Sequence, residues 1–240
     1  MCGRFGLAKP EKLDPKTIGV DEWEQVTLLP RFNIAPSQDV AVVLEIVREE
    51  EGRRVLTTAR WGLVPHWAKD PSIGDRLINA RADSVAVKPA YRAAFKRQRC
   101  LIPADVFYEW EDRGRGAPRQ PYAIRRKDGE PFCFAGLWEE WRPKGAASAE
   151  GAENATGAEP LLTCAIITTD ANGVMAAFHH RMPVILAPAD YDRWLDPATP
   201  LDEVTTLLKP APDSWLEAYP VSQYVNDPRH DDPRTLEPVA

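Results

Sequence analysis

The sequence has no hydrophobic run near the ~18 residues that a membrane span needs, and its start does not resemble a secretory signal. It also lacks G-x-G-x-x-G, P-loop, H-E-x-x-H and EF-hand motifs, so a nucleotide cofactor or a common metal site is not indicated. The four cysteines are far apart and form no C-x-x-C pair, which fits isolated thiols in a reducing cytosol. We therefore expect a cytoplasmic protein that uses no cofactor and no metal.

The 240 residues are 44% hydrophobic and 28% charged, which is ordinary for a soluble globular protein. The 23 prolines indicate a fold rich in loops and strands. Residues 144–160 contain no large apolar residue, and we expect them to be a flexible insertion within a single domain spanning 1–240. The residues from about 226 are expected to form an extended tail on the surface.

Runs of β-branched and aromatic residues predict the strands. Residues 39–47 and 54–61 should pair as a hairpin. Residues 122–126 and 132–141 should form a second hairpin around an Asp-Gly turn. Residues 99–111 read as one strand. Cys100, Cys133 and Cys164 lie in apolar, strand-like stretches and are expected in the core.

The residue with the most unusual reactivity is Cys2. Aminopeptidases generally remove Met1 when a small residue follows, which would leave Cys2 with an α-amine and a thiol on adjacent carbons. These groups titrate near ~8 and ~8.5 when unperturbed. Such a 1,2-aminothiol condenses with an aldehyde to an imine, which the thiol then closes to a thiazolidine ring. The alternative is an ordinary start followed by a small residue.

Charge is unevenly distributed along the chain. The net charge is −6, yet residues 76–99 contain seven basic residues and one acid, a local charge of +6. A basic patch on an acidic protein favours a confined anionic ligand over diffuse duplex binding. The alternative is a solvated helix face, because residues 89–98 read as a short basic helix.

Several polar residues can be explained either by a structural or by a functional role. Glu109 is flanked by aromatic residues, so burial would raise its pKa and suit it to acid–base work; otherwise it is a surface carboxylate on an edge strand. Asn79 is either a helix N-cap or a side chain oriented into a site, with Arg81 two residues on for a phosphate. His179 and His180 suit proton transfer but are often structural.

Tryptophans offer stacking surfaces. Trp61 reads as a core residue. Trp67 stands beside Pro65 and a polar stretch, and it is either core or an exposed platform for stacking a base, which contributes roughly 1–3 kcal/mol per base.

Six short motifs occur together in the order found in SOS response-associated peptidase proteins, also called abasic-site-processing proteins. The chain resembles this family from Cys2 to about Asp232. The motifs are Met1-Cys2-Gly3-Arg4-Phe5, Phe32-Asn33-Ile34-Ala35-Pro36, Trp61-Gly62-Leu63-Val64-Pro65, Asn79-Ala80-Arg81, Phe107-Tyr108-Glu109-Trp110 and His179-His180-Arg181-Met182-Pro183.

The resemblance implies an α+β fold, a single β-rich domain with a barrel-like mixed sheet flanked by short helices. It implies a monomeric sensor of single-stranded DNA that crosslinks to abasic sites through Cys2 and associates with the nucleoid when bound. By analogy, Asn79 positions the sugar and amine, Glu109 handles protons and His179 assists ring opening or imine chemistry. The DNA-binding residues implied are Arg4, Trp67, Arg81 and Arg181.

Three alternatives remain open. The name peptidase suggests that Cys2 removes Met1 itself, although a host aminopeptidase would suffice. Class II amidotransferases also begin Met-Cys-Gly and hydrolyse glutamine, but no synthetase or isomerase domain accompanies Cys2 here. A non-covalent single-stranded-DNA-binding module would need no reactive Cys2.

Overall fold

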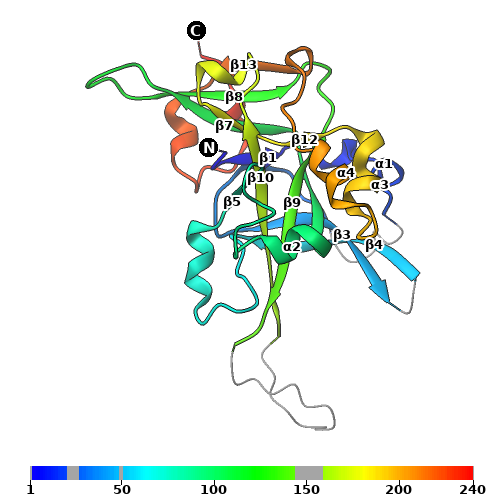
Figure 1. Ribbon diagram of the computed structural model, residues 1–240. Coiled ribbons are helices and arrows are strands. Elements are labelled where there is room, and N and C mark those ends of the chain that lie inside the picture. The colour runs from blue at the N-terminus through cyan, green and yellow to red at the C-terminus, as the bar shows by residue number, and fades with distance from the viewer. Residues whose placement is uncertain (1, 21–26, 49–50, 144–158, 240) are drawn as a thin grey trace.

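The computed structural model describes residues 2–20, 27–48, 51–143 and 159–239, and two β-sheets dominate it (Figure 1). The first sheet has the strand order β13 (Leu216–Pro220), β8 (Gln120–Arg126), β7 (Val106–Glu111), β1 (Phe5–Leu7) and β2 (Arg31–Ile34). The second follows β11 (Arg181–Pro183), β10 (Leu161–Asp170), β4 (Glu51–Trp61), β3 (Asp39–Arg48), β6 (Arg99–Ala104), β9 (Phe132–Trp141) and β12 (Ile185–Leu186), with β5 (Asn79–Arg81) alongside β10.

The second sheet closes on itself. Strand β10 pairs with β4 in parallel and with β9 in antiparallel fashion, so β10, β4, β3, β6 and β9 form a ring. Short helices lie against this ring, namely α1 (Pro15–Ile18), α2 (Arg92–Arg97), α3 (Tyr191–Leu195) and α4 (Leu201–Thr206). The α+β class with a mixed, ring-like sheet is therefore confirmed.

Strand alternation divides the core into two main apolar clusters. Along β6, Cys100 and Ile102 point into a cluster shared with Phe5 and Phe107 of the first sheet. Leu101, between them, points to the other face and into the cluster that α2, α3 and α4 cover. Because both of its faces are buried, β6 is nearly all apolar. Trp61, Cys100, Cys133 and Cys164 are all fully buried, as expected.

Two expectations about the strands were wrong. Residues 99–111 form two strands in different sheets, because the chain breaks at Asp105, whose carboxylate accepts hydrogen bonds from the backbone N–H groups of Ala8 and Lys9. The expected hairpin of 122–126 with 132–141 does not form either. Strand β8 pairs with β7 and β13, whereas β9 pairs with β6, β10 and β12. The Asp-Gly signal specified the turn but not the partners of the strands.

The hairpin of β3 with β4 is confirmed, with Asp39 opposite Arg60. The insertion expected at 144–160 lies mostly outside the described residues, but its flanks are adjacent, since Trp141 pairs with Leu161. The C-terminal segment, expected to be extended, contains 3-10 turns at Gln223–Asn226 and Pro233–Leu236. Within the described ranges, no helix has the length and apolar character needed to cross a membrane.

One cation of the basic segment is structural. Arg99 is only 1% exposed, and its guanidinium donates to the carbonyl oxygens of Phe95, Lys96, Trp194 and Asp196 at 2.5 to 3.0 Å. It thereby joins the end of α2 to the end of α3. Arg99 is therefore unavailable to an outside anion, and the surface charge of residues 76–99 comes from the other basic side chains.

Replacing Arg99 with methionine should lower the free energy of unfolding by roughly 3 kcal/mol or more, because buried carbonyls left without donors cost about 1–3 kcal/mol each. Urea titration measures this loss. The matched control is Arg97→Met, which changes an exposed residue of the same type two positions away and should shift stability by less than about 0.5 kcal/mol. Equal stability of the two variants would contradict the structural role of Arg99.

Candidate functional site

Cys2 lies just before β1, where Asn79 holds its backbone and Arg4 is held against β7. The amide Nδ2 of Asn79 donates to the Cys2 carbonyl oxygen at 2.8 Å. The backbone N–H of Tyr108 donates to the Arg4 carbonyl oxygen at 3.0 Å, and the Cys2 thiol lies 3.9 Å from the same oxygen. These contacts fasten the N-terminal residues between β5 and β7. Cys2 is therefore fixed beside the strand that carries Glu109.

Glu109 and Cys2 are both buried. Glu109 is 5% exposed, and burial raises the pKa of its carboxyl group. Cys2 is fully buried, and burial together with the negative charge of Glu109 raises the pKa of the thiol. In the full 240-residue chain the thiol is thus held protonated. The two groups influence each other electrostatically, which makes Glu109 the natural proton donor or acceptor for chemistry at Cys2.

Asn79 is placed by the sheet and not by a helix cap. It begins β5, where it pairs with Ile166 of β10, and its backbone carbonyl accepts a hydrogen bond from the Tyr91 hydroxyl at 3.0 Å. While Nδ2 holds Cys2, the buried Oδ1 accepts no hydrogen bond from the described part of the chain. That oxygen can accept a hydrogen bond from an amine or hydroxyl group arriving at Cys2.

His179 and Glu109 line the same pocket, which has a volume of about 450 Å³. The Nδ1 of His179 accepts a hydrogen bond from the backbone N–H of Arg181 at 3.0 Å, so the neutral ring carries its proton on Nε2. Burial lowers the pKa of His179, which favours this neutral form. His180 is exposed and stacks on His179 with ring centroids 4.3 Å apart. Of the two histidines, the one that shares the pocket with Glu109 is His179.

The pocket also contains residues that the sequence did not single out as partners. They are Trp110, Asp112, Arg119 and Phe178. Phe178 directly precedes His179 in the sequence, so the position of His179 could have indicated that Phe178 lines the same pocket. Arg119 follows a turn, and nothing in the local pattern connects it with Glu109. Trp110 donates through Nε1 to the Asn226 side chain at 2.7 Å, which joins the pocket to the C-terminal segment.

Arg4 is half-buried, and its side chain is held by fixed partners. Its guanidinium donates to Asn33 Oδ1 at 2.9 Å and to the Val225 carbonyl at 3.0 Å, and it lies 5.9 Å from the centre of the Trp110 ring. Asn33, in turn, is fully buried and donates to the carbonyl groups of Val225, Asp227 and His230. The C-terminal segment thereby fixes the direction of Arg4.

Arg81 and Arg181 lie on the two strands that flank the end of β10. Arg81 is exposed and pairs with Asp83 at 2.5 Å. Arg181 is 3% exposed and donates to both the hydroxyl and the carbonyl oxygen of Thr168. Asp83 also lies 3.8 Å from Arg181. Arg81 therefore faces solvent directly, whereas Arg181 contributes its charge from beneath the surface.

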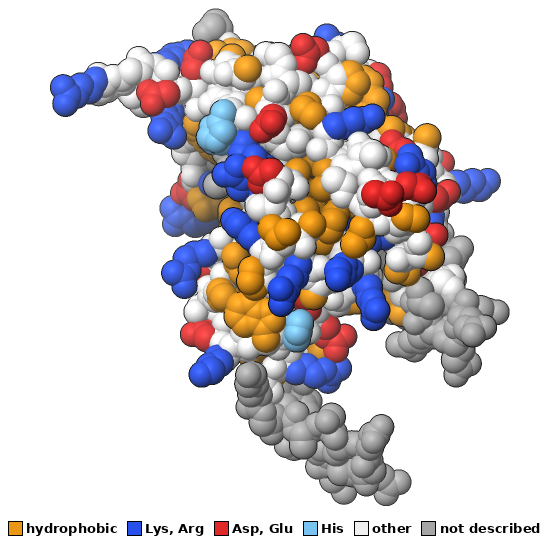
Figure 2. All heavy atoms as spheres, viewed as in Figure 1, with side chains coloured by type: hydrophobic (Ala, Val, Ile, Leu, Met, Phe, Trp, Pro, Cys, Tyr) orange, Lys and Arg blue, Asp and Glu red, His pale blue; other side chains and the backbone are white. Residues whose placement is uncertain are grey.

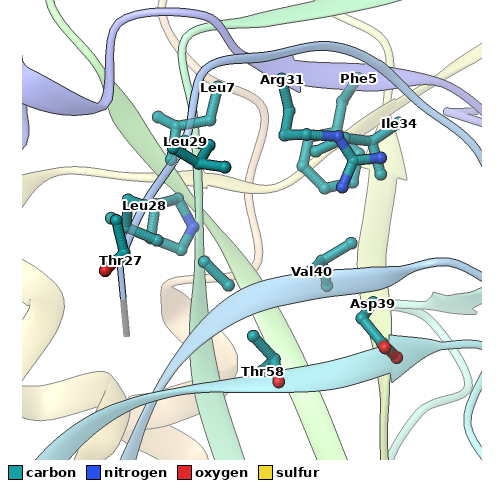
Figure 3. A pocket seen from close by; sticks show the side chains of 12 residues that line it. Phe5, Leu7, Thr27, Leu28, Leu29, Arg31, Ile34, Asp39, Val40 and Thr58 are labelled. Carbon is teal, nitrogen blue, oxygen red and sulfur yellow. The ribbon is translucent and has the colours of Figure 1, made fainter. Parts of the chain in front are cut away.

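Trp67 is 44% exposed, so it is not a core residue. A second pocket, of about 210 Å³, opens between β1, β2 and β3. Figure 3 shows Leu7, Leu28 and Leu29 on one side of it and Val40 on the opposite side. None of the sequence-predicted site residues lines this apolar pocket. In the described ranges, no cluster of three His, Cys, Asp or Glu side chains is placed to hold a metal ion.

Comparisons with known proteins place this site in context. The family described as SOS response associated peptidase (SRAP) matches residues 1–228. Abasic site processing protein YoqW of Bacillus subtilis (strain 168) is 39% identical over 239 residues, which cover 99% of each chain. Abasic site processing protein HMCES of Gallus gallus is 37% identical over 238 residues, covering 88% of this chain and 66% of the relative.

A solved structure gives the same likeness at the level of the fold. The crystal structure of a protein from Bacteroides thetaiotaomicron matches with a TM-score of 0.79 at 25% sequence identity, and the match covers 100% of both chains. The similarity thus extends along the chain and is not confined to one motif.

Proposed function

The chain belongs to the SOS response associated peptidase (SRAP) family, and on that premise we propose that it captures abasic sites in single-stranded DNA by a covalent bond to Cys2. The relatives' names supply the substrate class, since both YoqW and HMCES are called abasic site processing proteins. The observation that carries the proposal is the convergence of Asn79 and Glu109 on Cys2.

The chemistry starts once Met1 has been removed. An abasic sugar opens to an aldehyde, and the α-amine of Cys2 adds to the aldehyde carbon. Loss of one water gives an imine. The Cys2 sulfur then attacks the imine carbon while its proton passes to the nitrogen, which closes a thiazolidine ring. The net change is one new C–N bond, one new C–S bond and one water released.

Each neighbour of Cys2 has a role in this sequence. Glu109, whose pKa burial raises, protonates the hydroxyl group that leaves as water. Asn79 fixes the Cys2 backbone and offers Oδ1 to a hydrogen of the Cys2 α-amine. The Nε2–H of His179 donates to the sugar oxygen during ring opening. Burial of the site keeps bulk water from competing for the imine.

The DNA strand is bound by charge and stacking. Arg81 faces solvent and contacts a phosphate flanking the abasic site, while Arg4 and Arg181 add positive potential from within. Trp67 stacks on a neighbouring base. The chain acts as a monomer in this scheme and associates with the nucleoid only through DNA.

The test compares three single strands that differ at one nucleotide: one treated with uracil glycosylase, the same strand after borohydride reduction of its aldehyde, and the intact strand. We expect a band shift on a denaturing gel with the first alone. A shift with the reduced strand would contradict aldehyde chemistry. Equal binding of all three without any covalent band would favour a non-covalent binding module, and glutamine hydrolysis would favour the amidotransferase alternative.

Removal of Met1 is a separate step. Burial and the charge of Glu109 raise the pKa of the Cys2 thiol, so the full chain has little thiolate to attack the Met1 carbonyl. We therefore assign this step to a host aminopeptidase and not to Cys2 itself. The intact mass of purified chain that still carries Met1 should stay constant over time, and spontaneous loss of methionine would support an autopeptidase.

A further inference from the structure

A hollow of about 620 Å³ lies outside the site described above, and three of its six lining residues are Lys or Arg. We call it the basic pocket, and it is lined by His66, Arg92, Ala93, Lys96, Arg97 and Gln98. Figure 2 shows Lys and Arg side chains gathered over the face that carries α2. Among the described residues, none forms an ion pair with Arg92, Lys96 or Arg97. Their charges are therefore available to an outside anion.

The three cations all come from the exposed side of one short helix. Ala94 and Phe95 are its buried residues and pack into the core, so Arg92, Lys96 and Arg97 face solvent. Arg92 and Lys96 are four residues apart, and like charges at that spacing destabilise a helix by about 0.2–0.5 kcal/mol. The helix dipole favours cations in the last turn but opposes Arg92 in the first. Helix stability does not explain this arrangement, whereas a bound anion would.

The basic pocket is joined to the Cys2 site through Asn79. Tyr91 immediately precedes α2, and its hydroxyl donates to the Asn79 carbonyl at 3.0 Å, while the Asn79 side chain holds Cys2. On the other side of the pocket, His66 precedes the exposed Trp67. The carboxylate of Glu139, which is nearly buried, lies 3.5 Å from Nδ1 of His66. The start of α2 is therefore in contact with Asn79, the residue that holds Cys2.

We propose that the basic pocket binds backbone phosphates of the single strand that flanks the abasic nucleotide, so that the DNA footprint extends beyond the covalent site onto α2. This inference rests on the proposed function and adds a second anchoring point to it. Single-stranded DNA fits the pocket because it offers closely spaced anions in a flexible chain, which a confined set of side chains can follow. Arg92, Lys96 and Arg97 each neutralise one phosphate region, and none touches the reacting atoms.

The test uses a pocket variant, Arg92→Ala/Lys96→Ala/Arg97→Ala. Its matched control is Lys9→Ala/Lys127→Ala/Lys209→Ala, which removes three exposed positive charges elsewhere. Fluorescence anisotropy measures the affinity of each protein for reduced, non-reactive abasic strands of about 5 and about 20 nucleotides, lengths that bracket the site size of a typical single-strand groove. Thermal melts of all three proteins check that each is folded.

We expect the pocket variant to bind the long strand about tenfold more weakly than wild type and the control. The slope of log affinity against log salt should become shallower by about 2, since each phosphate that the protein no longer neutralises removes about 0.7 from it. The short strand should show little difference. If Ala substitutions disturb α2, the single variant Lys96→Glu supplies the same test and should weaken long-strand binding in its own right.

Three results separate failure of this inference from failure of the proposed function. If wild type forms a covalent product but the pocket variant binds the long strand as the control does, the basic pocket has no role in DNA binding. The same anisotropy measurement is repeated with the flank of the long strand made duplex. If the weakening appears only there, the pocket binds double-stranded DNA and the single-strand assignment is wrong. If wild type forms no covalent product at all, the proposed function fails regardless of the pocket.

Discussion

The variant Cys2→Ala will form no DNA adduct that survives denaturation. Its alanine is small, so Met1 should still be removed and a free α-amine remain, but no thiol can close the ring. The imine formed by the amine alone is reversible and will hydrolyse on the gel. We therefore expect the yield of stable product to fall to background, which densitometry of the shifted band measures.

Borohydride added during the reaction provides the control for Cys2→Ala. The reductant converts a transient imine to a stable amine, so the variant should regain a crosslinked band if its amine still reaches the aldehyde. Recovery would show that the site is folded and binds DNA, and that only the sulfur step is missing. A stable Cys2→Ala product without reductant would contradict the role of the thiol.

The variant Glu109→Gln will slow crosslink formation by about 10²-fold or more, within the range of about 10²–10⁴ for general acid–base catalysis. Glutamine keeps the size of the side chain and its hydrogen bonding but cannot deliver a proton to the departing hydroxyl. Single-turnover rates at saturating DNA separate this effect from binding. A rate near that of wild type would exclude Glu109 as the proton donor.

The pH dependence of the rate supports the same assignment. Because burial raises the pKa of Glu109, its acid form persists to higher pH than that of an ordinary glutamate. The wild-type rate should fall as pH rises through that pKa, and the rate of the Gln variant should not show this decrease. The neighbouring variant Glu111→Gln, a more exposed carboxylate on the same strand, should leave both the rate and its pH profile unchanged.

Glu109→Gln should lower the reaction rate but raise the stability of the protein. A folded-state pKa above the unfolded value means that Glu109 favours the native state at low pH, and that this contribution is lost as pH rises through the folded pKa. The ionised, buried carboxylate therefore costs stability at neutral pH. Glu109→Gln should melt a few degrees higher at neutral pH, with the difference vanishing in acid, so its slow reaction could not be attributed to unfolding.

Much of the site could be predicted because its chemistry is local. An N-terminal cysteine and a carboxylate among aromatic residues are recognisable from their neighbours alone. Burial of Glu109 and the ring-like sheet agree with those expectations. The three other cysteines, predicted to be core residues from their apolar settings, are indeed buried.

The remaining features depend on contacts between distant residues. Arg99 looked like part of a surface charge run, and only the ends of α2 and α3 reveal that it is a buried donor. The hydrogen bond from Arg4 to Val225 joins residues that are more than two hundred positions apart, and it fixes the C-terminal segment against β1. The strands on either side of the Asp-Gly turn separate into different sheets for the same reason, since partner choice is decided by packing across the whole domain.

In the proposed reaction, one residue supplies both the nitrogen and the sulfur that bond to the sugar aldehyde. The intact mass of the purified adduct tests it most directly. The expected mass is that of the chain without Met1 plus the abasic strand minus one water, with the modification located on Cys2 by fragmentation. An adduct that retains Met1, or one that is attached at any other residue, would contradict it.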